Sequence, residues 1–308
     1  MRKTLLRALP RVRYPPRAYC TLEQQTLLRS GVAEMRHHGV PDAEESGKWM
    51  LKAAMSKDGD IRASFEAMVR RRLRREPVQY VIGAWDFYGL TLRCRSPVLI
   101  PRPETETLVE AIIEHHRHHQ VRAFMDIGCG TGAIGLALLK EWPQSHCVFV
   151  DVSRDAIELT AENAALHGLE GRVSIELLDI TQETPRGVVP DQQLDMIVSN
   201  PPYVPSAEMA ELEPELAFED PQALDGGTDG LELAKHVVAR SAGLLKPDGK
   251  LWLELDEGHP RRLAEWLNGA GASKAMMEVQ HGFADLAGRE RFALLGHATC
   301  GGGTGVQP

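Results

Sequence analysis

The sequence predicts an α/β fold: a Rossmann-like, mostly parallel seven-stranded sheet that follows a small helical N-terminal domain and a linking β-hairpin. Three observations support this prediction. From residue 121 on, short apolar runs alternate with segments of helical periodicity, which is the pattern of a parallel sheet with right-handed crossovers. A glycine-rich turn, residues 128–135, follows the first of these runs. Residues 21–76, by contrast, show helical periodicity alone.

The N-terminal segment is basic and contains no acid before Glu23. Its basic residues alternate with leucines and valine, so it lacks the continuous apolar core of a secretory signal. This composition predicts a mitochondrial transit peptide over residues 1–22, with a disordered basic tail as the alternative. The six basic residues are Arg2, Lys3, Arg7, Arg11, Arg13 and Arg17.

Charge and cysteine content exclude several classes of protein. The 308-residue chain has a formal net charge of −8, which becomes −14 without the six basic residues of the leader. An acidic protein is unsuited to binding a nucleic-acid backbone and favours a basic protein partner. Five scattered cysteines without a Cys-x-x-Cys pair indicate neither a zinc site nor a disulfide framework. No apolar run approaches the ~18 residues of a membrane-spanning helix, so no membrane is expected.

Residues 23–76 contain two predicted helices after the leader. A capping-box-like start at Asp42 predicts the first, and an apolar stripe from Ile61 to Leu73 predicts the second. The second ends in the arginine run of residues 70–75. We expect this run to form a solvated face at a helix C-terminus, although contact with nucleic acid or an acidic partner is the alternative.

Residues 77–106 are expected to link the two domains. Val78–Gly83 and Trp85–Leu90 are rich in β-branched and aromatic residues, which predicts a hairpin. A proline-pinned loop precedes a helix that begins near Thr105 and ends in a histidine cluster, residues 115–119. Because the spacing does not direct four imidazoles to one point, we expect a solvated surface there and no metal site.

The seven strands are predicted from apolar runs bounded by turn residues. The fifth follows a turn, Lys246–Gly249, and the last two are short. The Gly-rich tail, residues 298–308, is expected to be flexible. The predicted strands cover residues 121–127, 146–150, 173–178, 194–199, 250–255, 276–279 and 291–295.

Glycines and acids collect where the first three strands end, which is the edge at which open parallel sheets bind ligands. The glycines of residues 128–132 let the backbone approach a ligand closely, and the following helix N-terminus offers N–H groups. Asp151 ends the second strand, where its carboxylate can accept both hydroxyls of a ribose. Asp179 follows the third strand and can accept the exocyclic amine of adenine.

The glycine spacing alone leaves the cofactor open. Gly130, Gly132 and Gly135, with Asp151 following the first of them by 21 positions, also satisfy the dinucleotide pattern G-x-G-x-x-G. Two features favour S-adenosylmethionine over NAD. An acid, Asp126, stands just before the glycine run, and the tetrapeptide Asn200–Tyr203 has no obvious role in hydride transfer.

This tetrapeptide, Asn-Pro-Pro-Tyr, ends the fourth predicted strand. Its two prolines fix the backbone and offer no N–H, so the carbonyls of Asn200 and Pro201 should point outward in a fixed direction. The predicted ligand is an amide or amino nitrogen, held by the Asn200 side-chain oxygen and the Pro201 carbonyl, with its flat group against the Tyr203 ring. A plain turn after a strand is the alternative.

Together these segments resemble the HemK/PrmC family, the protein glutamine N5-methyltransferases that modify peptide-chain release factors. With the basic leader, the resemblance points to the mitochondrial form. Three positions depart from the family pattern: Ile180, where an aromatic residue is common, Glu219–Pro221, and Glu254–Asp256. The resemblance spans most of the chain and rests on residues 78–83, 99–106, 126–134, 200–203, 223–231 and 285–291.

The resemblance implies a class I S-adenosylmethionine-dependent methyltransferase fold. Its domains would be a leader (1–22), a helical substrate-docking domain (23–76), a hairpin linker (77–106), a catalytic domain (107–297) and a flexible tail (298–308). The implied cofactor-binding residues are Gly128, Cys129, Gly130, Thr131, Gly132, Asp151, Asp179, Ile180 and Asn200. The implied catalytic and substrate-binding residues are Asn200, Pro201, Pro202 and Tyr203.

The expected reaction transfers the methyl group of S-adenosyl-L-methionine to the side-chain amide nitrogen (N5) of glutamine in the Gly-Gly-Gln loop of mitochondrial release factors. It would run in the matrix, release S-adenosyl-L-homocysteine and need no metal. N6-adenine methylation of nucleic acid is the alternative, because Asn-Pro-Pro-aromatic suits an exocyclic amine equally well; the acidic charge and the lack of a basic target-recognition domain argue against it. A non-catalytic binding module would be expected to have lost Asn200 or the prolines, and all are present.

Overall fold

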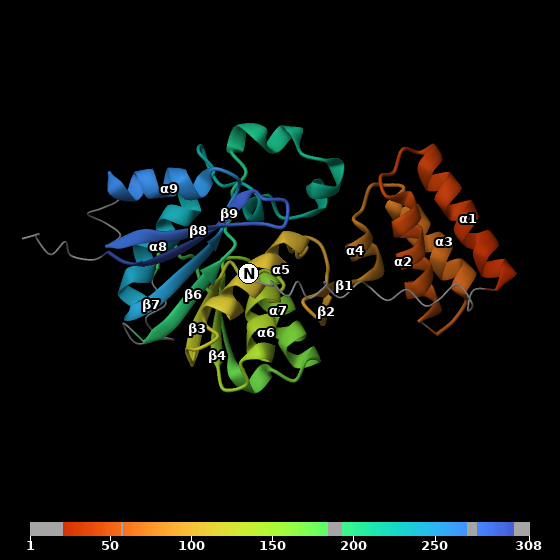
Figure 1. The fold of residues 1–308 in the computed structure, drawn as a ribbon. Helices are drawn as coiled ribbons and strands as arrows, with labels where there is room; N and C mark the ends of the chain where they lie inside the picture. The colour runs from red at the N-terminus through yellow and green to blue at the C-terminus, as the bar shows by residue number, and fades with distance from the viewer. Residues whose placement is uncertain (1–20, 57, 184–192, 270–275, 299–308) are drawn as a thin grey trace, which may run out of the picture. The chain divides into compact units, whose positions relative to one another are not determined.

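The computed structural model describes residues 21–56, 58–183, 193–269 and 276–298 (Figure 1). By its internal contacts the chain divides into two compact units. The first runs to Ser96 and also includes Glu213–Phe218, and the second holds Pro97–Leu212 and the chain from Glu219 onward. Most of the predicted leader and nearly all of the predicted tail lie outside the described residues.

The first unit is a helical bundle with a small hairpin. A capping box at Thr21 starts α1, and Asp60 caps α3 by accepting from the N–H groups of Arg62 and Ala63. Asp42 is the N-cap of α2, as predicted, but the capping-box bond is missing, because this residue has a left-handed backbone (φ 50°) and its side chain makes no cap bond. The elements are α1 (Leu22–His37), α2 (Ala43–Met55), α3 (Ile61–Arg72), α4 (Val78–Ile82), β1 (Ala84–Phe87) and β2 (Leu90–Arg93).

The hairpin begins later than the sequence predicted. Val78–Gly83, expected to be a strand, forms the short helix α4, which ends at Gly83 with φ 82°. The two strands pair from Ala84↔Arg93 to Phe87↔Leu90. A five-residue apolar run is too short for its periodicity to separate helix from strand, and here tertiary burial of Val78, Tyr80 and Val81 favours the helix.

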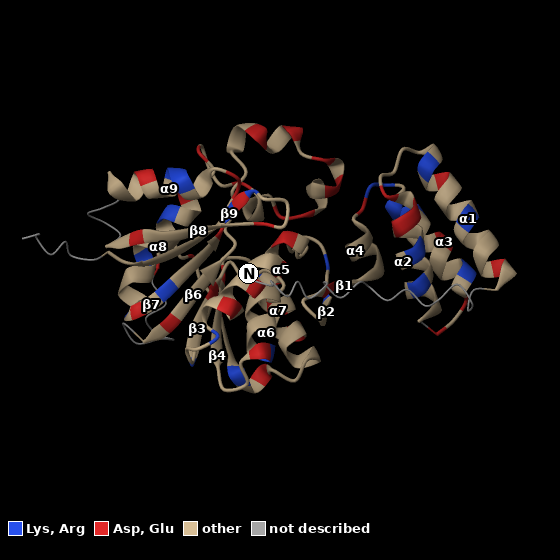
Figure 2. Cartoon of the chain, viewed as in Figure 1, with Lys and Arg blue, Asp and Glu red and all other residues tan. Residues whose placement is uncertain are grey.

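The arginine run of residues 70–75 is only partly the solvated face that we expected, because Arg70 and Arg74 are exposed while the other three pair with acids. Arg72 is only 4% exposed, and its Nη1 lies 3.0 Å from Glu215 Oε1. Arg75 donates to both oxygens of the same carboxylate at 2.7 and 2.6 Å, while Arg71 pairs with Glu76. Glu215 belongs to the 3-10 helix η4 (Pro214–Phe218). Figure 2 shows basic and acidic residues interspersed on α2 and α3.

The second unit contains a seven-stranded sheet of order β5-β4-β3-β6-β7-β9-β8. The first five strands are parallel, whereas β9 runs antiparallel to both β7 and β8. The predicted mostly parallel sheet is confirmed. Its strands are β3 (Ala123–Ile127), β4 (His146–Asp151), β5 (Val173–Leu177), β6 (Leu194–Ser199), β7 (Leu245–Glu254), β8 (Met277–Ala284) and β9 (Glu290–His297).

One strand is longer than expected. The predicted turn Lys246–Gly249 lies inside β7 as a bulge, since the pairing with β6 jumps from Leu194↔Leu245 to Met196↔Lys250. A proline and a glycine within a strand commonly mark such a bulge, so turn residues alone misplaced its start.

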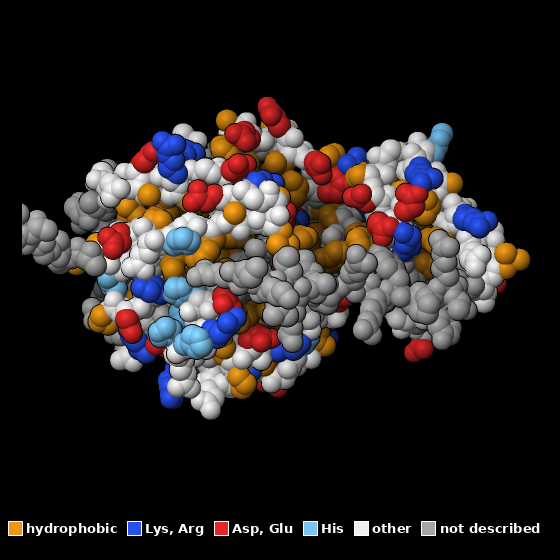
Figure 3. All heavy atoms as spheres, in the orientation of Figure 1, with side chains coloured by type: hydrophobic (Ala, Val, Ile, Leu, Met, Phe, Trp, Pro, Cys, Tyr) orange, Lys and Arg blue, Asp and Glu red, His pale blue; other side chains and the backbone are white. Residues whose placement is uncertain are grey.

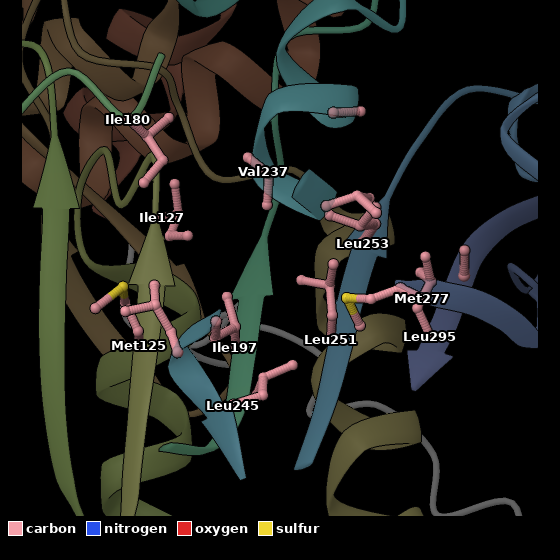
Figure 4. Close-up of a cluster of buried hydrophobic side chains, with 14 of the residues drawn as sticks. Met125, Ile127, Ile180, Ile197, Val237, Leu245, Leu251, Leu253, Met277 and Leu295 are labelled. Carbon is pink, nitrogen blue, oxygen red and sulfur yellow. The ribbon is translucent and has the colours of Figure 1, made fainter. Parts of the chain in front are cut away.

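Helices cover both faces of this sheet (Figure 1). On one face, Val237 of α8 and Leu263 of α9 join the strands in a core of fully buried side chains. Figure 4 shows Met125, Ile197 and Leu251 of neighbouring strands gathered in this core. The helices are α5 (Pro103–His115), α6 (Ala133–Glu141) and α7 (Arg154–Leu166) on one face and α8 (Glu232–Leu244) and α9 (His259–Asn268) on the other.

The histidine cluster after α5 is only partly the expected solvated surface. His116 is buried, and burial lowers its pKa to about 4. Its ring stands edge-on to Trp142, with 6.0 Å between the ring centroids. The other histidines of the cluster are exposed, and Figure 3 shows histidine side chains gathered on this unit's surface. Across the described residues, no three His, Cys, Asp or Glu side chains form a group that could hold a metal ion.

None of the helices in the described ranges combines the length and the apolar character needed to cross a membrane. The three cysteines of these ranges, Cys94, Cys129 and Cys147, are buried, and none forms a disulfide within the described residues. The remaining two, Cys20 and Cys300, lie outside the described residues.

Candidate active site

The glycine loop connects β3 to α6 at the point where the strand order reverses. Gly128, Gly130 and Gly132 all have left-handed backbones, with φ of 71°, 56° and 79°. The N–H groups of Gly128 and Cys129 donate to the carbonyl of Val150 at 2.8 and 3.3 Å, which ties the loop to β4. Glycine adopts left-handed backbones without strain. Three of them within five positions therefore let this sequence fold into a tight turn that exposes its backbone at the end of the sheet.

Asp126 stabilises the first turn of α6, which follows the glycine loop. Its side chain is 1% exposed, and Oδ2 accepts the N–H of Gly135 at 2.9 Å. Burial raises the pKa of Asp126 to about 7, although the bond from Gly135 opposes the rise. A Cβ at Gly135 would lie 2.3 Å from Phe149, so that only glycine leaves room for this approach. Asp126, the acid that favoured S-adenosylmethionine over NAD in the sequence, therefore stabilises the glycine loop from its buried side.

Asp151 links the loop to the end of β4. Its Oδ2 accepts the N–H of Gly130 at 3.0 Å, and Oδ1 accepts that of Ser153 at 2.9 Å. Burial raises the pKa of this carboxyl, while the backbone bonds lower it. These bonds hold the carboxylate in one orientation at the edge of the pocket.

Asp179 and Ile180 follow β5. One oxygen of Asp179 is used locally, because Oδ1 accepts the Thr181 N–H at 2.8 Å and the Thr181 hydroxyl at 2.7 Å. These bonds, the hydroxyl first, lower the pKa of Asp179, so the group is a carboxylate. Only its second oxygen remains for the predicted contact with an amine. Ile180 is buried and offers an apolar surface.

These residues surround one pocket, which encloses about 760 Å³ of space including its opening to solvent. The predicted cofactor-binding residues that line it are Gly128, Gly130, Asp151, Asp179, Ile180 and Asn200.

Three predicted cofactor-binding residues do not line the pocket. Cys129 is buried with its Sγ 3.4 Å from the Thr160 hydroxyl, and the Thr131 carbonyl accepts from Asn163 Nδ2 at 2.9 Å. A Cβ on Gly132 would lie 3.1 Å from Thr160. Cys129, Thr131 and Gly132 thus pack the loop against α7 and shape the pocket indirectly.

One wall of the pocket consists of residues that were not among the site residues predicted from the sequence. It is formed by Val98 and Leu99 and by Asp220, Gln222 and Ala223. The two segments are joined by the Asp220 N–H, which donates to the Pro97 carbonyl at 2.7 Å, and by a buried ion pair between Arg102 and Glu219 at 2.6 Å. The proline-rich segment before α5 was the only available signal, since contacts between positions over a hundred residues apart leave no local pattern.

The tetrapeptide Asn200–Tyr203 leaves the end of β6 beside the glycine loop. The Ser199 hydroxyl donates to the Ile127 carbonyl at 2.7 Å, which locks the ends of β6 and β3 together. Asn200 and Pro202 line the pocket. Pro201 is buried and Tyr203 is partly buried, and neither lines it.

The segment Ala223–Leu231 supports this tetrapeptide. The Gly226 N–H donates to the Val204 carbonyl at 2.8 Å, and Val204 N–H donates to the Leu224 carbonyl at 3.0 Å. A Cβ on Gly226 would lie 2.7 Å from the Pro202 carbonyl oxygen. A glycine is needed here so that two backbones can touch, and the contact holds the carbonyl of Pro202 against the segment Ala223–Leu231.

The fold is that of a class I methyltransferase, in which the pocket at the strand-order switch adjoins the Asn-Pro-Pro-Tyr segment. The family described as "Methyltransferase small domain" matches residues 103–225. Among solved structures, the hMettl16 catalytic domain, in complex with MAT2A 3'UTR hairpin 6, aligns with a TM-score of 0.51 and 17% identity over 68% of this chain and 76% of that one. At this identity the likeness shows the fold alone.

Curated relatives are more specific. The human MTRF1L release factor glutamine methyltransferase is 41% identical over 261 residues, covering 77% of each chain. The release factor glutamine methyltransferase of Geobacter sulfurreducens is 37% identical, covering 71% of this chain and 79% of its own length. That of Deinococcus radiodurans is 34% identical, covering 88% and 97%. This chain belongs to the release factor glutamine methyltransferase family.

Proposed function

We propose that this protein transfers the methyl group of S-adenosyl-L-methionine to the side-chain amide nitrogen of glutamine in the Gly-Gly-Gln loop of mitochondrial release factors. The observation that carries the proposal is the position of Asn200: it lines the donor pocket and begins the rigid Asn-Pro-Pro-Tyr segment. A substrate group bound by Asn200 would therefore lie beside the donor pocket. Family membership supports glutamine as the target.

The pocket residues fit S-adenosylmethionine. Two glycines with positive φ, Gly128 and Gly130, leave room for the methionyl end beside the backbone. The Asp151 carboxylate lines the pocket, where it would accept ribose hydroxyls, and Ile180 offers an apolar surface to adenine. When bound, the donor supplies a methyl group activated by its positive sulfur.

The chain's own task is to make a poor nucleophile reactive. An amide nitrogen shares its lone pair with the carbonyl, the resonance behind a rotation barrier of ~18–20 kcal/mol. Acceptance of both amide hydrogens, by the Asn200 side-chain oxygen and the Pro201 carbonyl, would orient the nitrogen toward the donor pocket. Positioning of this kind supplies ~7–11 kcal/mol when the reacting atoms are held in line.

Glycines beside the target suit the geometry of such a site. A side chain next to the glutamine would have to enter the same narrow opening, whereas Gly-Gly leaves the backbone free to bend. The acidic charge of the protein favours a basic protein partner, and the helical residues 23–76 would dock it. The basic, acid-free leader supports import into the mitochondrial matrix.

The proposal is tested with a purified mitochondrial release factor and its Gln→Asn variant in the Gly-Gly-Gln loop, which carries the same amide one methylene closer to the backbone. We expect the mass of one methyl group to be added to the wild-type factor alone. Equal labelling of both factors, or labelling of only DNA or RNA offered in the same mixture, would contradict the proposed substrate.

A further inference from the structure

The turn between β8 and β9, Asp285–Arg289, has no role in the site described so far. Asp285 Oδ1 accepts the N–H groups of Ala287 and Arg289 at 2.9 and 3.0 Å, and Oδ2 accepts Arg289 Nε at 2.8 Å. Gly288 closes the turn with φ 81°. The turn is therefore rigid, and two residues further along, β9 presents Arg291.

Arg291 connects this turn to the Asn-Pro-Pro-Tyr segment. Its side chain is buried, with 8% exposed. Nη2 donates to the Tyr203 hydroxyl at 3.1 Å, and Cζ lies 5.4 Å from the centroid of the same ring. On its other side, Nε donates to the carbonyl of Leu255 at 3.2 Å. The Arg291 guanidinium is thus anchored at the end of β7 and contacts both the hydroxyl and the ring of Tyr203.

A buried carboxyl accompanies this arginine. Glu254 ends β7 with 0% exposed, and the Thr105 hydroxyl is the side-chain donor beside its carboxyl. Because Ser199 pairs with Leu253, Glu254 stands one step further along, level with Asn200. Burial raises the pKa of Glu254 to about 7, whereas the nearby Thr105 hydroxyl and the Arg291 charge lower it. A buried carboxyl needs compensation, and the Arg291 charge supplies some of it.

We propose that Arg291 is a positioning residue that holds the Tyr203 ring in the orientation needed to receive the substrate's amide. The inference rests on the proposed function, since it concerns the same acceptor segment. A tyrosine ring beside a strand end can rotate about two side-chain bonds, and a charged hydrogen bond to its hydroxyl selects one orientation. Neither Arg291 nor Glu254 lines the donor pocket, so the effect should be confined to the amide substrate.

The test is a double-variant cycle with Arg291→Met, Tyr203→Phe and their combination. Each single variant should lower kcat/KM for the release factor roughly ten- to a hundredfold, the value of a hydrogen bond to a charged group. The combined variant should be no worse than the more impaired single one, because both remove the same bond. Calorimetric Kd for S-adenosylmethionine should stay at the wild-type value in all three.

Arg172→Met is the matched control. Arg172 Nη1 donates to the carbonyls of Trp142 and Ser145 at 3.0 and 3.4 Å, away from both pocket and tetrapeptide. This variant should lose stability without losing kcat/KM. Arg291→Lys, which keeps the charge and a donor, should recover part of the rate and decides the question if Arg291→Met does not fold.

Three results would each overturn the positioning role. The losses could multiply in the combined variant, or Arg291→Lys and Tyr203→Phe could both keep the wild-type rate. The third is a Kd for the donor that rises in step with the lost rate. Failure of the proposed function is seen separately, because the wild-type protein would then leave the release factor unmodified.

Discussion

Asp151 offers a quantitative test of the donor pocket, because the same chain contains a matched aspartate elsewhere. Asp151→Ala removes bonds to the N–H groups of Gly130 and Ser153, at 3.0 and 2.9 Å. Asp195 accepts the N–H groups of Arg122 and Ala123 at 2.7 and 2.9 Å and also pairs with Lys246, but it does not line the pocket. Loss of one such charged hydrogen bond costs ~1.5–3 kcal/mol. Each variant loses at least two, so either should melt about 6–24 °C lower.

Only Asp151→Ala should also weaken binding of the donor. A carboxylate that accepts ribose hydroxyls contributes hydrogen bonds of similar size, so Kd for S-adenosylmethionine should rise roughly ten- to a hundredfold, whereas Asp195→Ala leaves it unchanged. Calorimetric titration below the lower melting temperature measures both. An unchanged Kd in folded Asp151→Ala, or an equal rise in Asp195→Ala, would refute the assignment of Asp151 to the pocket.

Three further predictions follow from the site and the leader. Asn200→Ala should bind the donor normally but lose turnover by ~2.7–4 kcal/mol, by analogy with the deletion of an oxyanion-hole donor; a wild-type single-turnover rate would exclude the acceptor mechanism. Burial raises the pKa of Asp126 to about 7, so the folded state holds this proton more tightly than the unfolded state and the free energy of unfolding falls as pH rises from about 4 to about 7. Asp126→Asn, which keeps an oxygen for Gly135, should flatten that dependence in urea titrations, and an unchanged slope would count against the buried acid as its source. Residues 1–22 fused to a fluorescent reporter should enter mitochondria, and the same fusion with its arginines changed to Gln should not; cytosolic signal from both would argue against a transit peptide.

Much of the catalytic fold was accessible from sequence because it depends on local signals. Apolar runs marked the seven strands, and three glycines within 128–132 marked the loop, since positive φ at all three leaves no other residue. The bulge in β7 and the helix at Val78–Ile82 were missed, because Pro and Gly signal a turn or a bulge alike and five residues show no reliable period.

The parts of the site that depend on long-range contacts could not be predicted. Arg72 looked solvated, although Glu215, 143 positions away, neutralises it. Asp220 was not recognised as pocket-lining, because its place is set by the carbonyl of Pro97. Cys129 and Thr131 fit the motif but turn away from the pocket, which only the packing of the loop against Thr160 and Asn163 reveals.

The central claim, that Asn200 and Pro201 present a glutamine amide to the donor pocket, is tested most directly by finding which atom carries the methyl group. A release factor labelled with ¹⁵N in its glutamine side chains is incubated with the protein and a ¹³C-methyl donor, and the product is examined by NMR. The account predicts a one-bond ¹³C–¹⁵N coupling from the glutamine of the Gly-Gly-Gln loop. A methyl group on any other atom of the release factor, with that amide unmodified, would contradict it.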